Sequence, residues 1–283
     1  MIIDFHTHIF PSFFRDNKRA FFATEPAFER LYGSSRSRLV DRDDLLRSMD
    51  EAGVHKSVIF GFPWEKSDHF RRHNDHIIES VQRYPDRLIG LCCFSPLSPQ
   101  APGEAERCLT SGLSGVGELA VYGSDASAEP IYASTEIMRL CAHFDVPVLV
   151  HTNEPVGHDY PGKNPTTLAQ IYRFLKAYPK NKIVLAHWGG GLFFYALMKK
   201  EVKEVLLNVW FDTAASPYLY DTGIYRLAME ILGDDQILMG SDYPLLTPRR
   251  YLEEMAAAGL SRRTFEKIAG ENAARLLGVD GMR

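Results

Sequence analysis

The stretches Val146-Pro-Val-Leu-Val-His151 and Lys182-Ile-Val-Leu-Ala-His187 each join a short apolar run to a terminal histidine. Similar runs, rich in Val, Ile, Leu and Phe, recur between longer amphipathic segments, which is typical of βα units around a parallel sheet. Strands are expected over residues 2–6, 56–60, 88–94, 115–120, 146–151, 182–187, 206–213 and 236–242. Eight such strands predict a (β/α)8 TIM barrel, and 283 residues fit a single barrel domain of roughly 250 residues with insertions.

The segments between the strands predict helices and two long connections. Helices are expected over residues 43–52, 74–84, 134–144, 166–178 and 262–277, the last ending at Gly278. Residues 11–39 are too long for a simple βα loop and carry six aromatic side chains, which favours a lid or an interface element. Residues 153–165 also directly follow a strand. Both connections are expected at the end of the barrel where active sites form.

Composition narrows the classes of function. Hydrophobic residues make up 45% of the chain and charged residues 24%, enough for a substantial core. The net charge of -4 and the scattered Lys and Arg argue against nucleic acid as a partner, and no apolar run is long enough to span a membrane. We expect a cytoplasmic protein whose partner is a small molecule, and leave association of identical chains open. Cys92, Cys93, Cys108 and Cys141 show no CxxC spacing and are expected to be reduced core residues.

A pair of histidines ends the first expected strand, in Asp4-Phe-His6-Thr-His8. Because side chains two positions apart in a strand point to the same side, both imidazoles can face the mouth of a barrel. Two neutral imidazoles aimed at one point suit zinc or a similar borderline metal. Taken alone, the pair is equally compatible with structural packing.

Four further polar residues end apolar strands: Glu118, His151, His187 and Asp242. Burying so many ionisable groups near one axis is costly without a compensating charge. The sequence therefore predicts a divalent metal site at the C-terminal ends of the strands, holding one or two ions, with zinc favoured and manganese as the alternative. The candidate ligands are His6, His8, Glu118, His151, His187 and Asp242.

Five motifs resemble the amidohydrolase superfamily, and most closely its branch of aminocarboxymuconate-semialdehyde decarboxylase-like enzymes. They are Asp4-Phe-His-Thr-His-Ile-Phe-Pro11, Pro147-Val-Leu-Val-His151, His187-Trp-Gly-Gly-Gly191, Gly240-Ser-Asp-Tyr-Pro244 and Asn272-Ala-Ala-Arg-Leu-Leu277, and they span nearly the whole chain. The resemblance implies that His6, His8, His151 and Asp242 bind metal. It also implies that His187 is either catalytic or a ligand of a second metal.

Glu118 leaves the number of metals open. Many members of the superfamily bridge two metals with a carboxylated lysine from the fourth strand, whereas TatD-type nucleases use a glutamate there, which Gly117-Glu118-Leu119 resembles. The decarboxylase-like members typically manage with one metal and no ligand from that strand. Glu118 would then only orient a ligand or the substrate.

The sequence favours hydrolysis of a small-molecule lactone, amide or ester by a metal-activated water, with Asp242 as the base and His187 stabilising the oxyanion. The alternative is non-oxidative decarboxylation, or another carbon–carbon lyase reaction, of a carboxylated ring or muconate-like acid. A catalytically inert metal-binding scaffold is the third hypothesis. The same fold serves these chemistries, so it does not decide between them.

Some residues beside the strand ends are candidates for substrate contacts. Glu154, His158, Trp64 and Trp188 are the candidates, with core packing an equal alternative for the tryptophans. The remaining histidines are expected to be structural. His69, His73 and His76 share a helical spacing that favours a polar surface stripe, and His55 and His143 lie near element ends.

Overall fold

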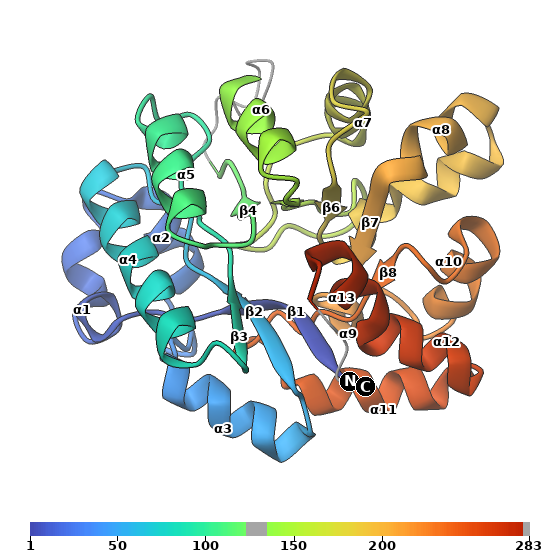
Figure 1. The fold of residues 1–283 in the computed structure, drawn as a ribbon, viewed down its shortest axis with the longest axis horizontal. Helices are drawn as coiled ribbons and strands as arrows, with labels where there is room; N and C mark the ends of the chain where they lie inside the picture. Colours follow the sequence, from blue (N-terminus) through green and yellow to red (C-terminus); the bar gives the residue numbers. More distant parts are fainter. Residues whose placement is uncertain (123–134, 280–283) are drawn as a thin grey trace.

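The computed structural model describes residues 1–122 and 135–279, with eight parallel strands surrounded by helices (Figure 1). The strands form two ladders, in the orders β1-β2-β3 and β4-β5-β6-β7-β8. Single parallel bridges join the ladders, from Cys92 to Val116 and from Thr7 to Tyr243. The order around the axis is that of a (β/α)8 barrel, as predicted. The strands are β1 (Ile3–His8), β2 (Lys56–Phe60), β3 (Leu88–Gly90), β4 (Val116–Leu119), β5 (Val148–Val150), β6 (Ile183–Leu185), β7 (Val209–Asp212) and β8 (Ile237–Leu238).

Helices cover the outer face of the strands (Figure 1). None in the described part of the chain is both long and apolar enough to cross a bilayer. They are α1 (Ser12–Arg15), η1 (Lys18–Phe21), α2 (Pro26–Tyr32), α3 (Arg42–Ala52), α4 (Ser67–Arg83), α5 (Ala101–Thr110), α6 (Thr135–His143), α7 (Leu168–Ala177), η2 (His187–Leu197), α8 (Lys200–Val205), η3 (Leu206–Asn208), α9 (Ser216–Leu219), α10 (Ile224–Leu232), α11 (Pro248–Ala257), α12 (Arg262–Glu266), η4 (Lys267–Glu271) and α13 (Asn272–Leu277).

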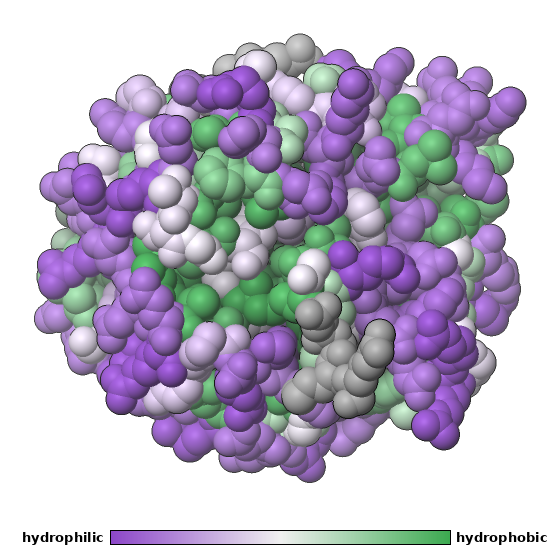
Figure 2. Space-filling view, viewed as in Figure 1, coloured by the Kyte–Doolittle hydropathy of each residue, from purple (hydrophilic) through white to green (hydrophobic). Residues whose placement is uncertain are grey.

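Alternation along the strands divides the core into an inner and an outer layer. On β2, Val58 and Phe60 belong to one buried cluster and Ile59 to the other. The smaller cluster lies inside the barrel and includes Leu149, Val184 and residues of α13, whereas the larger one lies between strands and helices. This is the period-two pattern expected of barrel strands. Figure 2 shows hydrophilic side chains around the rim of one face and apolar side chains toward its middle.

The predicted insertion over residues 11–39 contains α1, η1 and α2 and packs onto the barrel. Its Phe14 stacks on Trp64 at 4.4 Å between ring centroids, and its Phe28 lies 4.5 Å from the same indole. Glu25 is fully buried and accepts hydrogen bonds from the backbone N–H groups of Glu65 and Lys66, just before α4. The aromatic residues of the insertion therefore serve to dock it on the barrel.

Three sequence predictions need correction. The helix expected over 74–84 begins seven residues earlier, at Ser67. The helix expected over 262–277 is broken by the π-helical segment η4. Gly270 in this segment lies so close to the N-terminus that a Cβ there would be 2.3 Å from the Met1 carbonyl oxygen. The polar surface stripe is wrong for His73, which is fully buried. Ser134, the expected start of another helix, lies outside the described residues. The four cysteines are buried and free, as predicted.

Candidate metal centre

Irregularities in two strands aim the candidate ligands at the mouth of the barrel. The register between β1 and β2 shifts between Asp4 and Thr7, so that Ile3 and Phe5 point into the inner core while His6 and His8 both face the site. The register between β4 and β5 shifts around Glu118. Bulges of this kind re-aim side chains beside active sites. The prediction that both histidines face the same side is confirmed.

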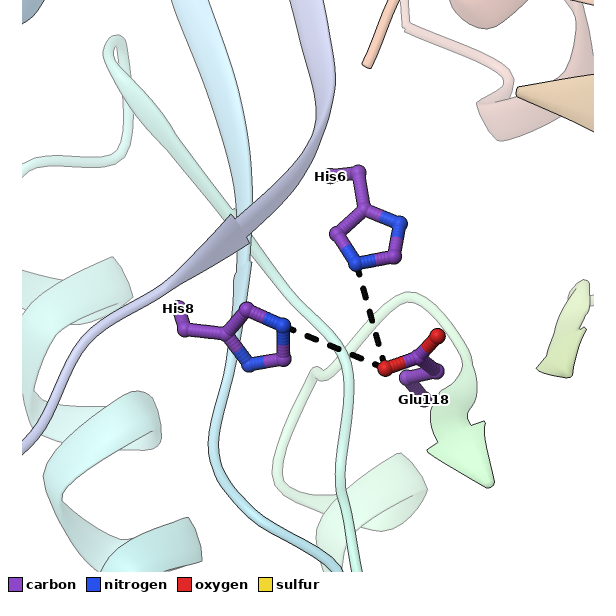
Figure 3. A group of neighbouring side chains, drawn as sticks. All are labelled: His6, His8 and Glu118. Carbon is purple, nitrogen blue, oxygen red and sulfur yellow. Dashed lines mark ion pairs between the residues drawn. The ribbon is translucent and has the colours of Figure 1, made fainter. Parts of the chain in front are cut away.

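All six predicted ligands converge at the C-terminal ends of the strands. His6 Nε2 lies 3.8 Å from Glu118 Oε2 and 3.6 Å from Asp242 Oδ1, and His8 Nε2 lies 3.9 and 3.4 Å from the same two oxygens (Figure 3 shows the two histidines and Glu118). The groups His6–His8–Glu118, His6–His187–Asp242 and Glu118–His151–His187 each bring three ligand atoms within 4.8 Å of one another. The cluster is therefore compact enough to surround a cation.

On the opposite side of Glu118 lie two further histidines. Oε1 of Glu118 is 2.9 Å from His151 Nδ1 and 3.5 Å from His187 Nε2, and these two nitrogens are 3.2 Å apart. Glu118 thus has one carboxylate oxygen facing the β1 histidines and the other facing His151 and His187. This position between two groups of imidazoles is compatible with a bridging role and with an orienting one.

Hydrogen bonds at Nδ1 fix the orientation of three of the histidines. His6 Nδ1 donates to Asp212 Oδ2 at 2.8 Å, His8 Nδ1 to the Gly61 carbonyl at 3.1 Å, and His187 Nδ1 to the Ala214 carbonyl at 3.0 Å. With the proton on Nδ1, the Nε2 lone pair of each ring is directed at the cluster. Metal-binding histidines are oriented in this way by the acceptor on their other nitrogen.

The donor set fits a divalent transition metal. His6 Nε2 is fully buried and has no hydrogen-bond partner among the described residues, although buried polar atoms are rarely left unsatisfied. Gly240 permits this arrangement, since a Cβ there would lie 2.8 Å from the His6 Cβ. His187 and Asp242 both have left-handed backbone conformations (φ 55° and 58°), a strain that non-glycine residues show mainly at functional sites.

Asp212 is a functional residue that the sequence analysis missed. Its carboxylate is fully buried at the end of β7, where Oδ2 accepts from His6 and Oδ1 accepts from the backbone N–H groups of His187 and Ala214, at 2.9 and 3.0 Å. One side chain thus positions two candidate ligands. The signal that could have revealed it is its place as the polar end of Val209-Trp-Phe-Asp212, as at the other strand ends.

The ionisable groups of the cluster shift one another's pKa values. Burial alone would lower the pKa of His6, but the negative charges of Asp212 and Glu118 raise it to about 10. Burial would raise the pKa of Glu118, but His151 and His6 hold it well below its usual value. The pKa of Asp242 is also lowered, because its hydrogen bond with His8 and the charges of the histidines outweigh burial. The carboxylates remain ionised and give the site the negative charge that attracts a cation.

The predicted substrate-contact residues lie in the core or in the loop after β5, and not in the ligand cluster. Trp64 is fully buried and its indole N–H donates to His73 at 2.9 Å, while Trp188 is fully buried and donates to Ser216 at 3.0 Å. Both tryptophans lie in the core, which was the alternative considered for them. Glu154 accepts from Tyr160 (2.9 Å) and Lys163 (3.1 Å) within the loop after β5, and His158 is exposed in that loop.

The comparison with protein families decides the family of this chain. Residues 3–279 match the family model described as amidohydrolase. The chain belongs to the amidohydrolase family. The resemblance drawn from the motifs is therefore confirmed, and with it membership of a superfamily of enzymes.

Several proteins similar to this amidohydrolase are decarboxylases. Gamma-resorcylate decarboxylase of Polaromonas sp. (strain JS666 / ATCC BAA-500) is 26% identical over 296 residues, covering 85% of this chain and 89% of the relative. 2-Amino-3-carboxymuconate-6-semialdehyde decarboxylase of Dictyostelium discoideum is 24% identical over 270 residues, covering 79% and 71%. The crystal structure of 5-carboxyvanillate decarboxylase from Sphingomonas paucimobilis superposes with a TM-score of 0.79 at 21% identity, covering 99% of both chains, and confirms the barrel fold.

These relatives correct the predicted reaction. Hydrolysis of a lactone, amide or ester was the favoured chemistry, and it is wrong as the main prediction because the similar enzymes are named as decarboxylases. The ligand cluster alone could not show this, since a metal at strand ends serves both reactions. Zinc, the favoured metal, gains no specific support: a solved dihydroxybenzoic acid decarboxylase from Polaromonas, with a TM-score of 0.72 at 21% identity, contains manganese.

Proposed function

We propose that this amidohydrolase is a metal-dependent, non-oxidative decarboxylase of a small aromatic or muconate-like carboxylic acid. The observation that carries the proposal is the similarity to gamma-resorcylate decarboxylases over 85–86% of the chain, combined with a strand-end cluster that keeps every predicted ligand together. The inert-scaffold hypothesis is disfavoured, because a scaffold has no need of metal ligands that a substrate can reach. Two of the candidate ligands, Asp242 and His8, have side chains that are 17% and 12% exposed, respectively.

His6, His8, His187 and Asp242 would hold the metal, with Glu118 and His151 completing its surroundings or holding a second ion. A bound divalent cation would act as a Lewis acid that binds the substrate carboxylate and stabilises developing negative charge. Imidazole nitrogen suits zinc, and carboxylate oxygen suits manganese, so the donor set accepts either. Manganese is the first metal to test, because similar decarboxylases contain it.

Asp242 is proposed as the group that delivers the proton. In non-oxidative decarboxylation a proton is added to the ring carbon that bears the carboxylate. The bond to the carboxylate then breaks, its electron pair returns to the ring, and CO2 leaves. Asp242 is the most exposed of the cluster carboxylates, so both solvent and substrate can reach it. It must acquire a proton before each turnover, and His187 is the alternative carrier.

The test is CO2 release by protein stripped of metal and reloaded with Mn²⁺ or Zn²⁺. The substrates are 2,6-dihydroxybenzoate and other hydroxylated benzoic acids labelled with ¹³C at the carboxylate, with a panel of lactones and esters as the comparison. We expect labelled CO2 from at least one aromatic acid, only with metal present. Hydrolysis of lactones or esters without CO2 from any acid would overturn the proposal, as would metal binding without turnover of either group.

A further inference from the structure

Two tyrosines from different parts of the chain contact the ring of Phe62, and one of them, Tyr122, lies beside the candidate ligand His151. Tyr32 is the last residue of α2 in the insertion, and its ring centroid is 5.9 Å from that of Phe62. Tyr122 follows β4, and its ring stacks parallel to Phe62 at 6.3 Å with an interplanar angle of 5°. Because Phe62 is itself buried, its ring fixes the spacing of the two phenols.

Among the described residues, the two hydroxyls have hydrogen-bonding capacity that no other side chain or backbone group uses. Neither has a hydrogen-bond partner within residues 1–122 and 135–279, and both side chains are half-buried. The unpartnered hydroxyls of Tyr225 and Tyr251, in contrast, are closed off from solvent. A phenol can donate one hydrogen bond and accept another. A ligand that reaches the site can therefore bond to Tyr32 and Tyr122.

Both phenols belong to the surroundings of the candidate ligands. The Tyr122 ring lies 5.6 Å from the His151 imidazole. Burial, together with the charges of Asp242 and Glu118, raises the pKa of Tyr32 and of Tyr122 above its usual value. A phenol has an ordinary pKa of about 10, so hydroxyls of this kind carry their protons at neutral pH and can donate. An oxygen substituent on a substrate is the acceptor that such donors complement.

The insertion holds Tyr32 in place through Glu25. This buried carboxylate accepts hydrogen bonds from the N–H groups of Glu65 and Lys66 at 3.0 and 3.1 Å and from His69 at 2.7 Å. The helix α2 begins at the next residue, Pro26, and ends at Tyr32. Its Phe28 packs against Trp64. The start and the middle of this short helix are therefore fixed on the barrel, and Tyr32 at its end contacts Phe62.

We propose that Tyr32 and Tyr122 are substrate-binding residues that hydrogen-bond to a ring oxygen substituent of the acid, such as a phenolic hydroxyl. The inference rests on the proposed function, because it places the ring of an aromatic acid between these tyrosines and the metal centre. It narrows the substrate to rings bearing oxygen in addition to the carboxylate. It also assigns the insertion a direct role in substrate selection.

The experiment measures binding instead of turnover. Calorimetric titration of the manganese-loaded protein uses 2-nitroresorcinol, which has no carboxylate to lose, and 2-nitrophenol, which lacks one hydroxyl. The wild type should prefer 2-nitroresorcinol. Tyr32→Phe and Tyr122→Phe should each reduce this preference by about two- to tenfold, the value of one hydrogen bond. Tyr172→Phe is the matched control, because its hydroxyl contacts Glu201 at 3.3 Å on the outer helices.

Metal content and thermal unfolding of each variant verify that it folds and retains its metal. An unchanged preference in both variants would overturn the inference, and so would a wild type that binds neither compound or does not discriminate between them. The proposed function is judged separately by CO2 release. If the protein releases CO2 but the variants keep the wild-type ligand preference, the proposed function stands and the role of the tyrosines is wrong. If the variants change the preference but the protein releases no CO2, the tyrosines bind the ligand and the proposed function is wrong.

Discussion

Replacing Asp212 by Asn tests whether this carboxylate orients the candidate metal ligands His6 and His187 through its hydrogen bonds. The variant keeps the shape of the side chain and changes one oxygen into an NH2 group. In the wild type both oxygens accept, one from His6 and the other from the backbone N–H groups of His187 and Ala214. Whichever way the amide is turned, its NH2 group faces a donor. Either His6 loses the acceptor that keeps its proton on Nδ1, or the turn that carries His187 loses its anchor.

The expected loss of metal affinity can be estimated because Asp212 bonds to candidate ligands without being one itself. Loss of a carboxylate that orients a ligating histidine typically lowers metal affinity or activity by about 10- to 100-fold. Asp212 orients two candidate ligands, so we expect the upper part of that range. A structural role alone would lower the free energy of unfolding and leave the metal affinity of the folded protein near that of the wild type. Metal affinity is thus the informative measurement.

The assay is competition for Mn²⁺ or Zn²⁺ against a chromophoric chelator, with thermal unfolding recorded in the presence and absence of metal. Asp50→Asn is the matched control, because that carboxylate is 66% exposed and bonds to Arg87 on the surface. The control should bind metal like the wild type. Asp212→Asn with wild-type metal affinity would refute the argument that the His6–Asp212 hydrogen bond prepares His6 as a ligand.

Three further predictions address the cluster and the core. Glu118→Gln should reduce the bound metal measured by elemental analysis and depress turnover by orders of magnitude, because a neutral amide binds cations poorly; unchanged metal content would leave Glu118 only an orienting role. Asp242→Asn should lower kcat by roughly 10^2- to 10^4-fold, measured together with metal occupancy and with His143→Gln as the control. If the variant turned over like the wild type, His187 would replace Asp242 as the proposed proton donor. Burial lowers the pKa of His73 from 6.5 to about 3, so the unfolded chain binds a proton there that the folded protein excludes, and stability should fall as the pH drops from 6.5 toward 3. In urea unfolding, His73→Gln should reduce the dependence of the free energy of unfolding on pH by up to about 1.4 kcal/mol per pH unit. An unchanged pH dependence would contradict the prediction that His73 causes it.

The strand-end residues could be predicted because barrel topology makes position along the chain equivalent to position in space. Once the apolar runs are recognised as strands, a polar residue at the end of each run must lie at one mouth. The candidate ligands His6, His8, His151 and Asp242 follow from this rule, and the structure brings their side chains together. Asp212 obeys the same rule, but it was placed inside an expected strand that continued to Thr213. A difference of one residue in the strand end concealed its role.

Contacts between distant segments could not be predicted. The spacing of His69 and His73 indicated a shared helical face, which was predicted to lie on the surface, and for the buried His73 this is wrong. The insertion covers it: His73 accepts from Trp64 and donates to the Ile9 carbonyl at 2.7 Å, and His69 bonds to Glu25. The early start of α4 was missed for the same reason, because the backbone ahead of that helix is bonded by a carboxylate 40 residues away in the chain.

The division between strands and connections explains why the metal site was easier to predict than the reaction. Strand ends supply ligands whose geometry the barrel imposes, and the same set can assist water attack or loss of CO2. The groups that distinguish a ring with oxygen substituents from a lactone must contact the rest of the substrate. We propose that they come from connections such as the insertion, in which α2 ends at Tyr32. In this protein the insertion is anchored beside the site by Glu25 and by aromatic packing on Trp64. A connection fixed in this way can hold a substrate-binding hydroxyl as rigidly as a strand holds a ligand, which is the condition for selecting a substrate by one hydrogen bond.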